Sequence, residues 1–233
     1  MRLRRILPLA MLALVAPSTA FGFDPASGQA TQAVQSPSLE QLLDFLVNER
    51  DVIGSATTNF DVEFERNFAS GGGDKAEARF PGITEVIRTA GKQEMIAILH
   101  ENYSALRATM AEILAQSLTQ SEMEQANTFY GSPTGRKLVS AAVAGARGPD
   151  IGSLVSTAQD AAVGAMGPED NEALAAFSRS DVFSKIAVLG AKLQQSSADW
   201  ATSVMKGSAE RLQNAVRTAG AAHVASLGSQ PGK

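Results

Sequence analysis

The 233-residue chain contains no cysteine, so disulfide bonds, cysteine-ligated metals and thiol nucleophiles are excluded. Its 24 acidic and 20 basic residues give a formal net charge of −4, which argues against general nucleic-acid binding and against docking on anionic lipid. With 44% hydrophobic residues, the chain is long enough to bury one large core or two small ones.

The first residues, 1–22, have the pattern of a secretory signal peptide. Three arginines precede a short apolar run over residues 6–16, and small residues then suit cleavage after Ala20 or Gly22, a choice that stays open. The run is shorter than the roughly 20 apolar residues that a transmembrane helix needs. We therefore expect a periplasmic protein without stable membrane insertion after cleavage. Loss of the three arginines leaves 17 basic against 24 acidic residues, a net charge of −7.

The remainder divides into a flexible leader (23–36), a helical domain (37–227) and a disordered tail (228–233). In the domain, apolar residues recur at steps of three, four or seven, as one face of a helix requires. No stretch alternates in the manner of a strand. The pattern predicts an all-α protein built as an antiparallel helical bundle.

Glycines, prolines and capping residues set the expected helix ends. The helices expected in chain order run from 37 to the glycines at 71–73, from 83 to about 116, from 120 to 130, from 133 to 147, from 150 to 166, from Gly167-Pro168 onward, from 182 to 204, and from Gly207 to about 227.

The stretch from Leu118 to Leu138 contains two helix starts. Thr119 and Glu122 are spaced as a capping box, in which the hydroxyl accepts from an amide three residues on and the carboxylate reaches back. Ser132-Pro133 places a capping residue before a proline, the preferred order at a new helix. The aromatic pair Phe129-Tyr130 lies between the two starts. This arrangement predicts a tight helix–helix corner.

This stretch resembles the bacterial domain-of-unknown-function family numbered 2059, whose members carry a Phe-Tyr-x-Ser-Pro-x-Gly-x-Lys phrase. The matching residues are Phe129, Tyr130, Ser132, Pro133, Gly135 and Lys137. The resemblance implies an exported helical protein and implies no substrate or activity.

A shift of 48 positions, from Glu124 to Glu172, aligns the motif with a second stretch without a gap. The identical pairs are Glu124 and Glu172, Phe129 and Phe177, Ser132 and Ser180, and Lys137 and Lys185. One interpretation is a duplicated helical hairpin with repeat units 118–165 and 166–213, stacked as in helical repeats. The other is coincidence between alanine-rich amphipathic helices, and both stay open.

No residue pattern indicates a catalytic, metal or cofactor site. Ser132 lacks the central position between glycines that a nucleophile elbow needs, so it is interpreted as a helix cap. Neither His100 nor His223 has another histidine or an acid three or four positions away. We therefore expect a protein that is not an enzyme.

The expected function is protein–protein interaction with an unknown envelope protein, through a surface near Tyr130 or along the stripe that contains Trp200. The alternative is a carrier that binds a lipid or another apolar small molecule between its helices, in a pocket of several hundred cubic ångströms. The oligomeric state is open between a monomer and a homodimer.

Overall fold

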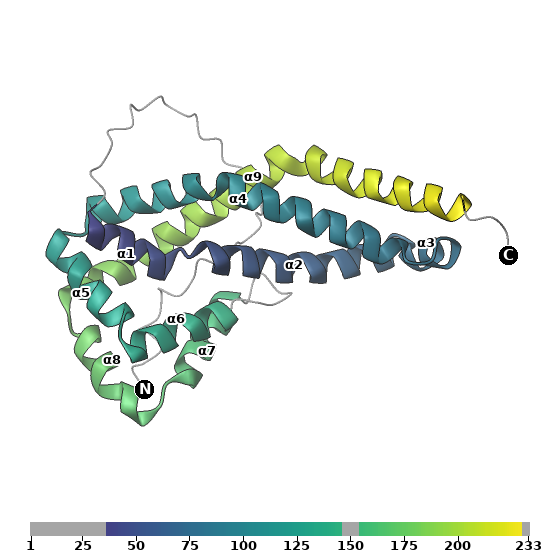
Figure 1. The fold of residues 1–233 in the computed structure, drawn as a ribbon. Helices are drawn as coiled ribbons and strands as arrows, with labels where there is room; N and C mark the ends of the chain where they lie inside the picture. The colour runs from purple at the N-terminus through teal and green to yellow at the C-terminus, as the bar shows by residue number, and fades with distance from the viewer. Residues whose placement is uncertain (1–35, 146–153, 230–233) are drawn as a thin grey trace, which may run out of the picture.

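The computed structural model describes residues 36–145 and 154–229, and all regular secondary structure within these ranges is helical (Figure 1). The predicted all-α fold is confirmed. The predicted signal peptide, the leader up to residue 35 and the tail from residue 230 lie outside the described residues. No helix within the described ranges combines the length and the apolar character needed to cross a membrane.

Three long helices form an extended arm. They are α2 (Glu49–Ser70), α4 (Ile83–Ser117) and α9 (Asp181–Gly228). At 1.5 Å per residue, α4 and α9 are about 50 and about 70 Å long. Helix α4 lies between the other two and packs antiparallel to both, while the short helix α3 (Gly73–Arg79) closes the tip (Figure 1).

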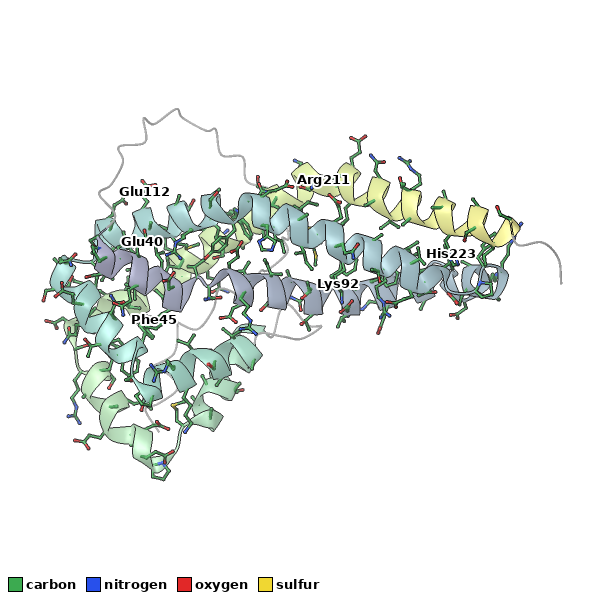
Figure 2. The ribbon with its side chains drawn as sticks, in the orientation of Figure 1. Glu40, Phe45, Lys92, Glu112, Arg211 and His223 are labelled. Carbon is green, nitrogen blue, oxygen red and sulfur yellow. The ribbon has the colours of Figure 1, made fainter. Side chains whose placement is uncertain are left out.

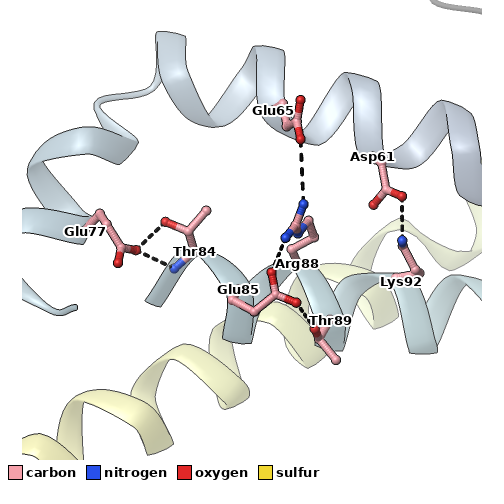
Figure 3. Close-up of polar contacts among 8 residues, drawn as sticks. All are labelled: Asp61, Glu65, Glu77, Thr84, Glu85, Arg88, Thr89 and Lys92. Atoms are coloured by element: carbon pink, nitrogen blue, oxygen red, sulfur yellow. Dashed lines mark hydrogen bonds and ion pairs between the residues drawn. The ribbon is translucent and has the colours of Figure 1, made fainter. Parts of the chain in front are cut away.

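Polar contacts set the register of α2 against α4. The Lys92 ammonium lies 2.5 Å from the Asp61 carboxylate, and the Arg88 guanidinium lies 3.6 Å from Glu65 (Figure 3). Partners 31 and 23 residues apart in sequence, read as 92 minus 61 and 88 minus 65, converge as expected for antiparallel helices. Each of these side chains is about a third exposed or more, so each pair contributes little to stability and mainly selects the register.

Local bonds hold the tip of the arm. Gly82 has a φ of 86°, which a glycine adopts without strain, and it turns the chain into α4. Its N–H donates to the Glu77 carboxylate at 2.6 Å. The Thr84 N–H donates to the same carboxylate at 3.0 Å (Figure 3). The Thr84 hydroxyl and these amides lower the pKa of Glu77 to about 2. From the far end of α9, His223 Nε2 lies 2.9 Å from the carbonyl oxygen of Pro81 (Figure 2).

The remaining helices form a head at the other end of the molecule, below α4 in Figure 1. They are α1 (Pro37–Leu46), α5 (Gln120–Tyr130), α6 (Pro133–Gly145), α7 (Leu154–Ala165), the 3-10 turn η2 (Pro168–Asp170) and α8 (Asn171–Ser178). Helix α1 packs on α5 and on the end of α4, and α6 packs along α7. The large buried cluster of the protein lies here, and it also receives the start of α9.

Two expected helix boundaries are wrong. The single helix expected from residue 37 to the glycines is interrupted at Val47, and Asn48 caps a new helix by accepting from the Arg50 N–H at 2.9 Å. The Tyr103 hydroxyl of α4 donates to the carbonyl of Val47, which fixes this break from outside the segment. Conversely, Gly207 does not end a helix, and α9 continues through it. One exposed glycine costs a helix only about 1 kcal/mol, which packing against α4 outweighs.

Candidate functional site

The motif from Thr119 to Lys137 forms the corner between α5 and α6. The predicted capping box is present: the Glu122 N–H donates to the Thr119 hydroxyl, and the Thr119 N–H donates to the Glu122 carboxylate at 2.8 Å. Ser132 caps α6, because its hydroxyl accepts from the Gly135 N–H at 3.0 Å. Pro133 occupies the first position of α6. The motif thus stops one helix and starts the next within two residues.

Gly135 allows α6 to cross the end of α5 at close range. A Cβ atom at this position would lie 2.0 Å from the carbonyl oxygen of Phe129 and 2.7 Å from the Cα of Tyr130. Both obstacles are backbone atoms and cannot move aside by changing rotamer. The glycine of the motif is therefore explained by the packing of two helices, without a ligand.

The two aromatic residues of the motif belong to the core. Phe129 stacks on Phe177 of α8 with centroids 3.9 Å apart and planes inclined by 4°. Tyr130 is 2% exposed and meets Phe177 edge-on and Phe45 of α1 at a tilt. Burial raises the pKa of the Tyr130 hydroxyl. As a correction to the expected interaction surface, Tyr130 is a core residue and offers no surface to a partner.

Lys137 makes an ion pair at the corner with two acidic residues. Its ammonium lies 2.7 Å from the Asp170 carboxylate and 3.2 Å from Glu169. Asp170 is 5% exposed and also accepts from the Thr134 hydroxyl at 2.7 Å and from the Gly167 N–H at 3.0 Å. The bond from Lys137 comes first among the causes that lower the pKa of Asp170 to about 2. Because the Asp170 carboxylate already binds three partners, it is suited to stabilising the fold and not to acid–base catalysis.

The second expected surface residue, Trp200, lies where the core of the head meets that of the arm. Its partly buried ring contacts both buried clusters, and its indole N–H donates to the carbonyl of Asn102 at 3.1 Å. An interaction role for Trp200 stays a prediction, and its ring also packs between the two buried clusters.

Neither histidine has a hydrogen bond to a residue of the motif among the described residues. His100 Nδ1 is 2.7 Å from a carboxylate oxygen of Glu49 on the exposed side of α4, and His223 lies at the tip of the arm. Within residues 36–145 and 154–229, neither ring contacts a serine side chain by hydrogen bond, and no three or more metal-ligating side chains gather as a candidate metal site.

A concave surface that sequence analysis missed lies where α6 meets the start of α2. We call it the corner groove, a hollow of about 450 Å³ lined by Asn48, Arg50, Asp51, Val139, Ser140, Val143 and Ala144. The buried stripe of α6 contains Leu138 and Ala142, so Val139 and Val143 form a second, partly exposed apolar edge. The spacing of four between these two valines was the only feature in the sequence that could have indicated this apolar edge. The residues that face it at the α1–α2 break could not be predicted from the sequence.

The corner groove contains one positively and one negatively charged side chain. Within the described part of the chain, the side chains of Arg50 and Asp51 make no ion pair, whereas the nearby Arg107 pairs with Glu40 and Asp44 at 2.7 and 2.8 Å. The groove therefore combines an apolar edge from α6 with a cation and an anion from α2. Such an arrangement can bind a chain that offers an apolar side chain flanked by charged groups.

No curated protein and no solved structure matches the chain. A family described as an uncharacterized protein conserved in bacteria, DUF2059, matches residues 104–146, which cover the end of α4, α5 and α6. The resemblance predicted from the Phe129–Lys137 phrase is confirmed over this part of the chain.

Proposed function

We propose that the protein is a non-catalytic interaction protein of the bacterial periplasm, and that it binds a polypeptide segment of an envelope protein in the corner groove. The observation that carries the proposal is one hollow lined both by the apolar residues Val139 and Val143 and by the charged residues Arg50 and Asp51. The capping residues of the motif and Lys137 are engaged in holding the fold, so the groove is the better candidate for recognition.

The shape and lining of the groove favour a polypeptide over a lipid. A carrier of apolar molecules encloses its ligand among apolar side chains, with few polar groups. Here Asn48, Arg50, Asp51 and Ser140 contribute a large part of the lining. Mixed apolar and charged contacts are typical of transient protein interfaces. The volume is within the range of a small-molecule pocket, so the lipid carrier is the alternative that the experiment must separate.

The N-terminal sequence supports the periplasmic part of the proposal. The sequence of residues 1–22 has the pattern of a cleaved signal peptide. Fractionation of cells that express the full-length chain, followed by intact mass measurement, tests this point. A periplasmic product that begins after Ala20 or Gly22 supports it, and a cytoplasmic product that retains Met1 refutes it.

Photocrosslinking in cells tests the groove. A photoreactive residue is introduced into the full-length chain at Ser140, which lines the groove, and separately at Val188, which is 79% exposed on α9 and serves as the control. We expect a protein-sized adduct from position 140 and none from position 188. The substitution Val143→Asp should abolish the adduct while the far-UV circular dichroism stays unchanged.

The possible outcomes of this experiment distinguish a protein-binding groove from a lipid carrier and from no binding site. Equal adducts from both positions, or none from either, refute the groove as a binding site. An adduct of lipid-like mass at position 140 favours the carrier. A protein adduct is followed by titration of the purified partner against the parent and against Val143→Asp, where at least a tenfold loss of affinity is expected.

A further inference from the structure

The head contains one arrangement of helices twice, at the same shift of 48 residues. Helices α4 and α7 end at Ser117 and Ala165, and α6 and α9 begin at Pro133 and Asp181. Between these boundaries, α5 corresponds residue for residue to η2 followed by α8. The agreement concerns the folded backbone and is independent of the four identical residue pairs in the sequence.

The caps of the two longer helices are the same. The Ser132 hydroxyl accepts from the Gly135 N–H at 3.0 Å, and the Ser180 hydroxyl accepts from the Phe183 N–H at 3.2 Å. Both pairs are separated by three residues and lie 48 positions apart. One corner of the head therefore repeats the other at the level of single hydrogen bonds.

The acids that open the preceding helices also correspond. Glu122 accepts from the N–H of Thr119 at 2.8 Å, and Asp170 accepts from the N–H of Gly167 at 3.0 Å. Each carboxylate thus closes the first turn of its own helix. Each carboxylate also binds a lysine that follows the other helix start.

Contacts between the two halves are reciprocal. Lys137 of the first half pairs with Asp170 of the second at 2.7 Å, and Lys185 of the second half pairs with Glu122 of the first at 2.6 Å. Position 185 corresponds to 137, and position 170 to 122. If residue i contacts residue j of the other copy, then j contacts i in return, which is the signature of a two-fold interface.

The stacked phenylalanines mark the position of this axis. Phe129 and Phe177 are equivalent residues, and they contact each other with nearly parallel planes. A residue that meets its own equivalent must lie on or near the two-fold axis. Helix packing has the same symmetry, because α4 packs along α9 while their counterparts α7 and α6 pack along each other.

This geometry differs from a stack of tandem hairpins. Stacking by translation brings one face of a repeat against a different face of the next, so its contacts run in one direction only. The unit boundaries also differ from 118–165 and 166–213. The end of α4 belongs to the same unit as Glu122, and α7 belongs to the same unit as Asp170. The units are residues 106–145 (unit 1) and 154–193 (unit 2). The DUF2059 match at 104–146 coincides with unit 1 alone.

We propose that units 1 and 2 form an intramolecular dimer of two copies of one three-helix unit. The surface that each unit buries is self-complementary, so the partner that it fits is a second unit of the same kind. A chain with a single unit is expected to bury this surface by pairing with another copy of itself. The arm, formed by α4 before residue 106 and α9 after residue 193 together with α2, has no counterpart and distinguishes the two halves.

Double-mutant cycles on the full mature chain test the two-fold relation. The acids are changed to their amides, Glu122→Gln and Asp170→Asn, so that each helix start keeps an acceptor. The lysines are changed by Lys137→Ala and Lys185→Ala. Urea unfolding then gives the unfolding equilibrium constant of each single and double variant.

We expect both cross-unit pairs, 137 with 170 and 185 with 122, to show coupling factors of about two- to fivefold in the unfolding constant. The within-unit combinations, 137 with 122 and 185 with 170, should show factors near one. Coupling in only one cross-unit pair, or coupling as large within units, overturns the proposal.

The axis is tested separately with Phe129→Leu and Phe177→Leu, which keep most of the apolar volume. Two equivalent residues should give single effects on the unfolding constant that agree within about threefold, and the double variant should lose less than their product, because the partners share one contact. A two-fold axis at this stack is contradicted if the single effects differ by more than about tenfold. It is also contradicted if the effect of the double variant equals the product of the two single effects.

Discussion

Gly135→Ala is expected to destabilise the protein because α6 crosses α5 at this residue. The added methyl carbon would lie 2.0 Å from the Phe129 carbonyl oxygen and 2.7 Å from the Tyr130 Cα. Ordinary contacts of this kind are about 3.4 Å or longer, so the two helices must separate by more than an ångström. Separation would loosen the aromatic cluster on one side and the Lys137–Asp170 pair on the other.

The magnitude follows from two opposing contributions. Overpacking a rigid site costs about 3 kcal/mol, at the upper end of the usual range, because only backbone can yield. Alanine is favoured over glycine within a helix by about 1 kcal/mol. The expected net loss is about 2 kcal/mol, or about 30-fold in the unfolding constant. It corresponds to a fall in melting temperature of about 4–8 °C for a chain of this size.

Gly207→Ala is the matched control. Gly207 is an exposed position in the interior of α9, where a Cβ atom would meet nothing within 4 Å. Only the helix preference remains, and stability should rise by about 1 kcal/mol. Thermal and urea unfolding, followed by far-UV circular dichroism, measure both variants. If Gly135→Ala is as stable as the parent, or shifts in the same direction as Gly207→Ala, the close approach of α6 to α5 is refuted.

Three further variants test other contacts. Because Lys137 and its neighbours lower the pKa of Asp170 to about 2 from 3.8, the stability that this group contributes is complete above about pH 4 and is lost as the pH falls towards 2. Asp170→Asn should therefore flatten the acid limb of the urea midpoint plotted against pH, and an unchanged limb would contradict the assignment. Trp200→Phe removes the indole bond to Asn102 and should cost about 1 kcal/mol in urea unfolding, with no loss counting against that bond. Phe177→Ala removes the stacked ring at the centre of the head and should cost about 3–5 kcal/mol in thermal unfolding, and a loss below about 1 kcal/mol would show that the stack is not a core contact.

Local signals in the sequence predicted the helix starts well. Thr119 and Ser132 each precede their helix by one residue and form the expected cap, because a capping side chain bonds to amides only two or three residues away. The all-α fold followed from the spacing of apolar residues, which directly reports a buried helix face. Such features depend on neighbours in the sequence, so one sequence is enough to find them.

Boundaries set by distant contacts were not predictable in this way. The break at Val47 is stabilised by Tyr103 of another helix, and the continuation of α9 through Gly207 depends on its packing along α4. The corner groove shows the same limitation. Val139 and Val143 are visible as an apolar edge, but Arg50 and Asp51 face them only because the chain turns at Asn48.

The sequence by itself determined which residues form helices, where most of them start, and that a stretch after residue 165 echoes the motif. Tertiary structure alone decided that Tyr130 lies inside, and that Lys137 and Lys185 each pair with the acid of the other half. Periodicity states which side chains share a face of a helix, but it does not say which other face they meet. That choice is made by the summed packing of helices far apart in the chain, as the ion pairs Lys137–Asp170 and Lys185–Glu122 illustrate.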